Sequence, residues 1–223
     1  APFSALMQPL GRARDLDVLL TEIVDPVLKA LPNEPRLPAI ASDITNRRYK
    51  SRTEAITMLA APAYGLTLLN ALESLHAPVP DSPTTIDLQE FASERLRRLR
   101  RKVRRLAQAA RIENPASLHA MRIGVKRLRY ALEFFSPLAH RRSLQRALNQ
   151  LASMQDVLGQ LNDLTNAGAL LMDCAGDDPR LREAVTLIGG WHGPRYAKLL
   201  KTIAREQPRL AKLRLPKLVS RMA

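Results

Sequence analysis

The sequence predicts an all-α protein built from two pseudo-symmetric helical bundles. Apolar residues make up 46% of the 223 residues and aromatic residues only 4%, with leucine and alanine dominating the apolar set. Strands prefer β-branched and aromatic residues, so this composition favours helices. Prolines divide the chain into segments with helical periodicity and without strand-like alternation. Long helices with short connections are typical of bundles.

The predicted helices follow one another between the prolines. We expect them over residues 3–9, 12–31, 36–60, 63–76, 85–111, 115–136, 140–158, 160–175, 180–191 and 194–213. Pro26 lies inside the second of these ranges and should kink that helix. Residues 77–84 are rich in proline and predict a linker.

An internal repeat links the two sides of this linker. Residues 10–18 resemble residues 158–166, with Gly11 over Gly159 and Asp15 over Asp163, at an offset of 148. A second match places Arg48-Tyr49 over Arg195-Tyr196 at an offset of 147. Two matches at nearly the same offset indicate two similar bundles, each with a Leu-Gly-x-x-x-Asp turn and a basic helix.

The offset also predicts where each repeat lies. We expect a partial first repeat over residues 1–76 and a second repeat over residues 85–223. The counterpart of His119 would fall about 29 residues before residue 1. The first bundle is therefore expected to lack its N-terminal helices in this chain.

Residues 118–130 carry the most informative pattern. Asn114 is a favourable N-cap and Pro115 suits the first helical position, while Pro137 limits the other end. Six apolar residues recur at steps of three and four and predict one buried stripe: Leu118, Met121, Val125, Leu128, Leu132 and Phe135.

The same helix carries a row of cations. His119, Arg122, Lys126 and Arg129 recur at the same steps, about a quarter turn from the apolar stripe. Like charges at this spacing repel one another. The row is therefore best explained by an anionic ligand that lies along it.

The preceding predicted helix is strongly basic. Between Arg95 and Arg111 there is no acidic residue. Beside its predicted buried stripe (Leu96, Leu99, Val103, Leu106 and Ala110) lie Arg97, Arg100, Arg104 and Arg111, with Arg101 just beyond. Packed antiparallel, the two helices could face one common cationic groove. The alternative is a solvated polar face, although such faces usually mix both signs.

Several other residues are weaker candidates. Arg48, Lys50 and Arg52 on one predicted helix, and Arg195, Lys198 and Lys201 on another, could extend the basic surface. Tyr130 could donate a hydrogen bond to phosphate or simply pack. Asp15 and Asp163 are better explained by structural than by catalytic roles. The four histidines show no metal-ligand spacing, so we expect no metal site.

The net charge of +14 indicates a polyanion or an anionic surface as partner. The single cysteine, Cys174, fits a reducing compartment, which predicts a cytoplasmic protein. No apolar run is long enough to span a membrane, and we expect no membrane partner. The sequence contains no Gly-rich phosphate loop, nucleophile motif or paired-carboxylate motif, which predicts a protein without catalysis or cofactor.

The aromatic residues bear on the choice of anion. Proteins that stack single-stranded bases use aromatic side chains, and no interleaving of basic and aromatic residues is visible here. The sequence fits better a protein that binds phosphate groups and is indifferent to bases. Binding to the DNA backbone stays open as an alternative.

Three segments resemble the conserved-histidine α-helical domain (CHAD). They are Leu118-His119-Ala-Met-Arg122-Ile-Gly-Val-Lys126-Arg127-Leu-Arg129-Tyr130-Ala-Leu-Glu133, the segment 151–163, and the segment 10–18. The resemblance implies two four-helix bundles with a basic pore or groove, and binding of inorganic polyphosphate rather than catalysis. It also implies recruitment to polyphosphate granules. Glu133 would orient a neighbouring arginine.

The polyphosphate site that we predict combines the charge pattern with this resemblance. Its residues are His119, Arg122, Lys126, Arg127, Arg129, Tyr130, Arg97, Arg100, Arg101, Arg104, Arg48, Arg52, Arg195 and Lys198. Two alternative functions stay open. One is sequence-indifferent nucleic-acid binding. The other is an accessory role for an upstream triphosphatase of the CYTH type, which often precedes such domains.

Overall fold

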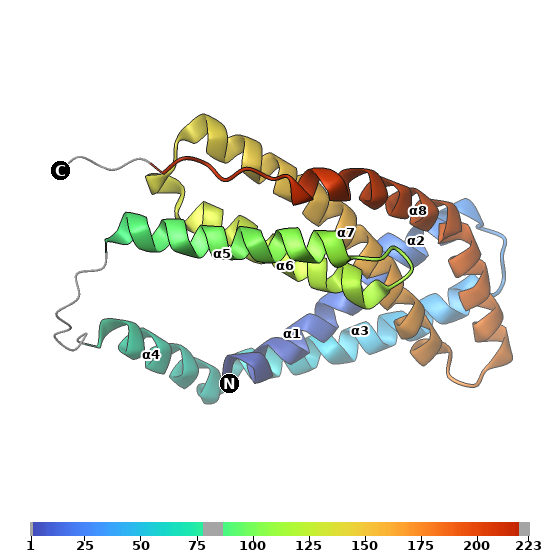
Figure 1. Ribbon diagram of the computed structural model, residues 1–223. Helices are drawn as coiled ribbons and strands as arrows, with labels where there is room; N and C mark the ends of the chain where they lie inside the picture. Colours follow the sequence, from blue (N-terminus) through green and yellow to red (C-terminus); the bar gives the residue numbers. More distant parts are fainter. Residues whose placement is uncertain (1, 78–86, 219–223) are drawn as a thin grey trace. The chain divides into compact units, whose positions relative to one another are not determined.

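The computed structural model describes residues 2–77 and 87–218, with side chains from residue 7 onward (Figure 1). Its helices are α1 (Pro2–Val18), a π-helix (Leu19–Val24), α2 (Asp25–Ala30), α3 (Leu37–Ala60), α4 (Pro62–His76), α5 (Leu88–Ala109), α6 (Pro115–Phe134), a 3₁₀ turn (Ser136–Leu138), α7 (Arg141–Ala175) and α8 (Pro179–Ala211). The described residues contain no strand, only one isolated antiparallel bridge between Ala139 and Leu218. The all-α prediction is confirmed.

The chain forms two compact units that do not follow the predicted repeat boundaries. Unit 1 comprises residues 1–82 and 163–193, and unit 2 comprises residues 83–162 and 194–223. The helices α7 and α8 each contribute to both units. The repeat boundaries themselves stay a prediction, and the linker predicted at 77–84 lies, apart from Ala77, outside the described residues.

Unit 1 is held together by an aliphatic core. The core residues are Leu16, Leu19, Ile23, Val24, Val27, Leu37, Ile40, Ile44, Ala167, Leu171, Cys174, Ala184 and Ile188. They come from α1, the π-helix, α2, α3, the end of α7 and the start of α8. Burial of such side chains stabilises the unit by about 1.5–3 kcal/mol for each large one.

The π-helix lies just before Pro26, where the sequence predicts a kink. Proline has no N–H to donate, so the helix must change its hydrogen bonding around this position. Opposite it, the ring of His192 is 5% exposed and its Nε2 lies 2.8 Å from the carbonyl oxygen of Ile23. A protonated Nε2 donates to that oxygen, which ties α8 to the π-helix.

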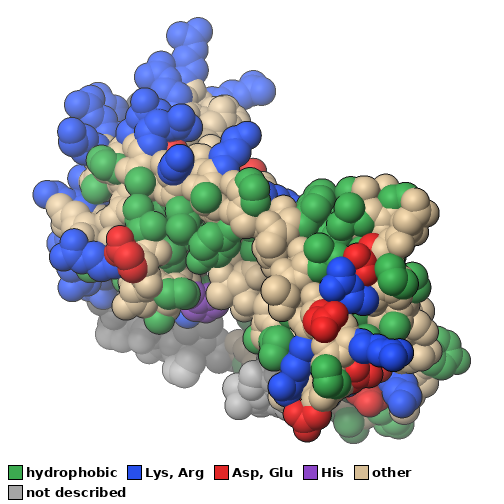
Figure 2. All heavy atoms as spheres, turned by 90° about the vertical axis from the view of Figure 1, so that its right-hand side faces the viewer, with side chains coloured by type: hydrophobic (Ala, Val, Ile, Leu, Met, Phe, Trp, Pro, Cys, Tyr) green, Lys and Arg blue, Asp and Glu red, His purple; other side chains and the backbone are tan. Residues whose placement is uncertain are grey.

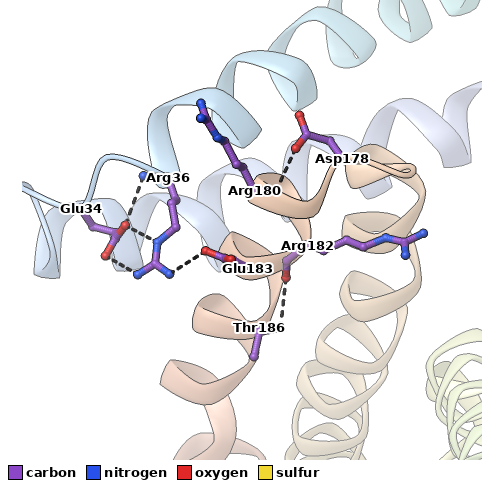
Figure 3. A network of polar contacts seen from close by, with 7 residues as sticks. All are labelled: Glu34, Arg36, Asp178, Arg180, Arg182, Glu183 and Thr186. Atoms are coloured by element: carbon purple, nitrogen blue, oxygen red, sulfur yellow. Dashed lines mark hydrogen bonds and ion pairs between the residues drawn. The ribbon is translucent and has the colours of Figure 1, made fainter.

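A network of ion pairs joins the segment before α3 to the start of α8 (Figure 3). Arg36 donates to both carboxylate oxygens of Glu34 and also reaches Glu183, at 3.3 Å. The hydrogen bonds from Arg36 lower the pKa of Glu34 to about 2. Asp178 accepts from the backbone N–H of Arg180 at 2.8 Å and so caps α8.

Unit 2 is built around α6. The six residues of its predicted stripe are all buried, none being more than 7% exposed. As predicted, Asn114 caps the helix by accepting from the backbone N–H of Ser117 at 3.2 Å, and Pro115 occupies the first turn. Leu96 and Val103 of α5, Leu151 and Leu158 of α7, and Ile203 of α8 are also buried in this unit.

Several predicted helix boundaries are wrong. The ranges 140–158 and 160–175 form the single helix α7, and 180–191 and 194–213 form the single helix α8, which continues through Pro194. The proline ring would crowd the carbonyl four residues earlier, but that residue is Gly190, which has no side chain to restrict adjustment. Gly11 and Gly159 lie inside α1 and α7, so the Leu-Gly-x-x-x-Asp segments are helical and not turns.

Among the described residues, no single helix is long and apolar enough to cross a membrane. The consecutive helices α3 and α4 meet that criterion only when they are taken together, and they are bent by 55° where they join.

Candidate functional site

The cations of α6 form a ladder on one edge of the helix, as predicted. We use the name α6 ladder for His119, Arg122, Lys126 and Arg129. Burial of the apolar stripe fixes the rotation of the helix, so these four side chains are left exposed or half-buried. The row of positive charge therefore follows directly from the packing of the core.

His119 at the start of the ladder is oriented by α7. Its Nδ1 lies 3.0 Å from Oδ1 of Asn162. An Nδ1–H that donates to this amide oxygen leaves Nε2 as an acceptor in the neutral ring and as a donor in the protonated ring. Asn162 was not predicted as a partner of His119, although it lies next to Asp163 in a segment that resembles the family.

Tyr130 lies between the two cations at the other end. The charged groups of Lys126 and Arg129 are 5.6 and 5.4 Å from the centre of its ring, which is within cation–π distance. Glu133, expected to orient an arginine, contacts Arg129, with Oε1 3.4 Å from Nε. This ion pair lacks hydrogen-bond geometry, and Arg129 Nε is buried without a hydrogen-bond partner in the described structure.

Arg122 and Lys126 make no ion pair with a carboxylate in residues 7–77 and 87–218. Both are half-buried, and each lies within one helical turn of another ladder cation. Repulsion between neighbours is therefore not relieved by acidic side chains here. In the view of Figure 2, Lys and Arg gather over one part of the face with few acidic side chains among them, while elsewhere both signs are interspersed.

The packing of α5 against α6 centres on Gly124. A Cβ at this position would lie 2.7 Å from Cδ1 of Leu106 and 3.6 Å from Cγ2 of Val103, so the end of the Leu106 side chain would have to shift to make room for it. The two helices run antiparallel, because Phe91 near the start of α5 contacts Phe135 at the end of α6.

A groove with a volume of about 1540 Å³ follows these two helices. We call it the α5–α6 groove. It is lined by Phe91, Arg95, Arg98, Leu99, Arg101, Lys102, Arg104, Arg105, Gln108, Arg127, Tyr130, Ala131, Phe134 and Phe135. Of the predicted site residues, it brings together Arg101, Arg104, Arg127 and Tyr130.

The prediction of one common groove for both cationic rows is wrong. No residue of the α6 ladder lines the α5–α6 groove. The reason is rotational: Gly124 faces α5, and Arg122 lies about 160° away around the helix, at 100° per residue. The ladder thus faces away from α5.

The arginine row of α5 is also placed differently from the prediction. Arg100, Arg104 and Arg111 line a second hollow with Lys212 and Arg214, at the end of α8. This hollow has a volume of about 840 Å³. Gln207 of α8 closes the junction by donating to the carbonyl oxygens of Ala107 and Ala110 near the end of α5. Arg97 is exposed and lines neither hollow.

In unit 1, Arg48 and Arg52 both bind the carboxylate of Asp17, Arg52 at 3.0 Å. Partial burial opposes ionisation of Asp17, but the hydrogen bonds and charges of the two arginines outweigh it and lower its pKa. These two predicted site residues are therefore neutralised in part by a structural carboxylate. Lys50 is exposed on the same helix.

The predicted site cations of α8 form no ion pair with a carboxylate in the described part of the chain, unlike Arg205 and Arg209, which both pair with Glu206. Arg195 donates to Oε1 of Gln160 at 3.1 Å, and Lys198 and Lys201 are exposed. Gln160 lies two residues from Asn162, so Arg195 and His119 are both held by the same turn of α7.

Asp15 and Asp163 lie near each other in unit 1. Burial raises the pKa of Asp15, and the charge of Asp163 raises it further. They line a small hollow with Asn166. The described residues contain no group of three or more His, Cys, Asp or Glu that could hold a metal ion.

The fold and this surface define a class: a protein whose described part is helical and carries many cations that lack acidic partners there. Comparison identifies the family. A family model described as "CHAD domain" matches residues 1–172. The chain also superposes on the crystal structure of the CHAD domain from the plant Ricinus communis, with a TM-score of 0.81 and 31% sequence identity, over 98% of this chain and 73% of that chain. No curated protein gives a significant match. The chain belongs to the CHAD domain family.

Proposed function

We propose that this protein binds inorganic polyphosphate through the α6 ladder, without catalysing a reaction. The supporting observation is that Arg122 and Lys126 lie side by side without an acidic partner in the described residues, beside a histidine oriented by Asn162. A chain of phosphates supplies the regularly spaced negative charges that would relieve their repulsion. Membership of the CHAD family supports the same ligand.

Binding would rest on charge and hydrogen bonds. Arg122 can donate a forked pair of hydrogen bonds to phosphate oxygens, and Lys126 supplies a compact point charge. A protonated His119 adds a donor at Nε2. Counterions released from the polyanion drive association. We expect Arg195, which donates a hydrogen bond to Gln160 near the start of the ladder, to extend the site.

The test compares two double charge reversals. Arg122→Glu with Lys126→Glu removes the centre of the ladder, and Arg141→Glu with Arg142→Glu changes two exposed cations at the start of α7. Both variants have the same formal net charge. We expect the ladder variant to weaken polyphosphate binding at least about tenfold more than the control, as measured by calorimetry, equivalent to about 1.4 kcal/mol.

Two results would contradict the proposal. Equal losses in the two variants would mean that only net charge matters. Binding of long polyphosphate no tighter than that of orthophosphate would mean that the ladder does not engage successive phosphates.

A further inference from the structure

The α5–α6 groove combines aromatic rings and cations in a way that polyphosphate binding does not use. On α5, Phe91, Arg95, Arg98, Lys102 and Arg105 follow one another at steps of four, three, four and three. On α6, Arg127, Tyr130 and Phe134 follow at steps of three and four. Residues at these steps share one face of a helix, so each helix presents a mixed row of rings and cations to the groove.

The rings gather at one end of the groove. Phe135 is buried and holds Phe91 and Phe134 in edge-to-face contacts, with ring centres 6.2 and 5.0 Å away. Phe134 is nevertheless 77% exposed and Phe91 47% exposed. Because both exposed rings contact the same buried ring, they form one apolar patch at the end of the groove, and such patches mark binding sites.

The rest of the groove is cationic. Seven of its lining residues are Arg or Lys, and in the described part of the chain only Arg98 is paired with a carboxylate, that of Glu94. A purely inorganic anion would use these cations but would gain nothing from the phenylalanine rings. The fitting ligand carries closely spaced phosphates and flat apolar rings together.

We propose that the α5–α6 groove binds single-stranded nucleic acid, with the phosphates on the arginine and lysine row and unpaired bases stacked on Phe134 and Phe91. Stacking on aromatic side chains beside a cationic track is how sequence-tolerant single-strand binding works. A duplex offers the phosphates but keeps its bases inside. An anionic membrane offers charged headgroups and apolar chains. The rings here line a hollow between two helices, however, which suits a strand that enters it better than a membrane surface.

This site is separate from the α6 ladder. None of the ladder residues lines the groove, and Tyr130 is a groove residue whose ring lies next to the ladder residue Lys126. The two sites can therefore be disabled independently. Charge reversal at Arg122 and Lys126 tests the proposed polyphosphate site and leaves the groove cations in place.

The experiment uses two fluorescently labelled strands of equal length, one of thymine nucleotides and one abasic, so that only the bases differ. We expect the thymine strand to bind more tightly in anisotropy titrations. Phe134→Ala should weaken thymine binding about tenfold, within the range for loss of one stacked base. It should leave the abasic strand and polyphosphate unchanged. The matched control is Tyr49→Ala, which removes another exposed ring, 74% exposed, from unit 1.

Three outcomes would overturn the proposal. The first is equal affinity for the two strands, and the second is an equal effect of Phe134→Ala and Tyr49→Ala on thymine binding. The third is loss of binding to phosphatidylserine vesicles in Phe134→Ala while thymine binding persists unchanged, which would assign the rings to a membrane surface. Because Phe134 is 77% exposed, its removal is not expected to unfold the chain.

Discussion

Neutralising one ladder cation should change the salt dependence of polyphosphate binding by a predictable amount. Each phosphate contact with a flexible single-stranded polyanion contributes about 0.7 to the slope of log K against log salt. Arg122, Lys126 and Arg129 together would therefore contribute a slope of about −2. Arg122→Gln removes one contact and should make the overall slope shallower by about 0.7.

This change is large enough to measure. If only the phosphate contacts of the ladder are counted, a fourfold rise in salt would weaken polyphosphate binding by the wild type about 20-fold and by Arg122→Gln about 7-fold. Titrations at several salt concentrations give both slopes, and Arg141→Gln serves as the control for a cation far along the chain. An unchanged slope in Arg122→Gln, or an equal change in Arg141→Gln, would refute the assignment of Arg122 to phosphate contact.

Three further predictions concern stability. His192→Phe, which removes the hydrogen bond to the π-helix while keeping a ring, should lower the free energy of unfolding by about 1–2 kcal/mol in urea titrations. Gly168→Ala, on a helix with open space around it, should stabilise by about 1 kcal/mol, whereas Gly124→Ala should gain less because its Cβ would crowd Leu106. Folding lowers the pKa of Asp17, so its ionised carboxylate stabilises the folded state above its unfolded pKa. This stabilisation is lost as the pH falls through the folded pKa of Asp17. The variant Asp17→Asn should therefore lose less unfolding free energy than the wild type on acidification below about pH 4.

Each of these has an outcome that would contradict it. Trp191→Phe changes the neighbouring half-exposed ring. If it lowered the free energy of unfolding as much as His192→Phe, the hydrogen bond to the π-helix would not be the cause of the loss. Equal gains for the two glycine variants would mean that α5 and α6 are not in tight contact at Gly124. An identical acid profile for Asp17→Asn would show that its ion pairs do not contribute to folding.

Local pattern predicted α6 almost completely. Its cap, its first proline and all six stripe residues lie where periodicity places them, because one buried face dictates the rotation of a helix. Periodicity does not tell which neighbour each edge meets. Arg100 and Arg104 were expected beside the ladder, but they line a hollow with the end of α8, since α5 approaches α6 at Gly124 on the opposite side.

Other features depend on contacts between distant residues. Gly159 and Pro194 are normally signals for interruption, yet both lie inside long helices whose apolar faces are buried along their length. No interleaving of aromatic and basic residues was recognised in the sequence, although Phe91 and Phe134 each share a face of their own helix with arginines. The two rings reach one groove only through the antiparallel pairing of α5 and α6.

The sharing of α7 and α8 between the units has a consequence for any attempt to divide the protein. Residues 163–193 belong to unit 1, although unit 2 surrounds them on both sides in the sequence. No single uninterrupted fragment can contain one whole unit without part of the other. A protease cut within α7 should consequently release no independently folded piece, and the two products should stay associated as complementing fragments.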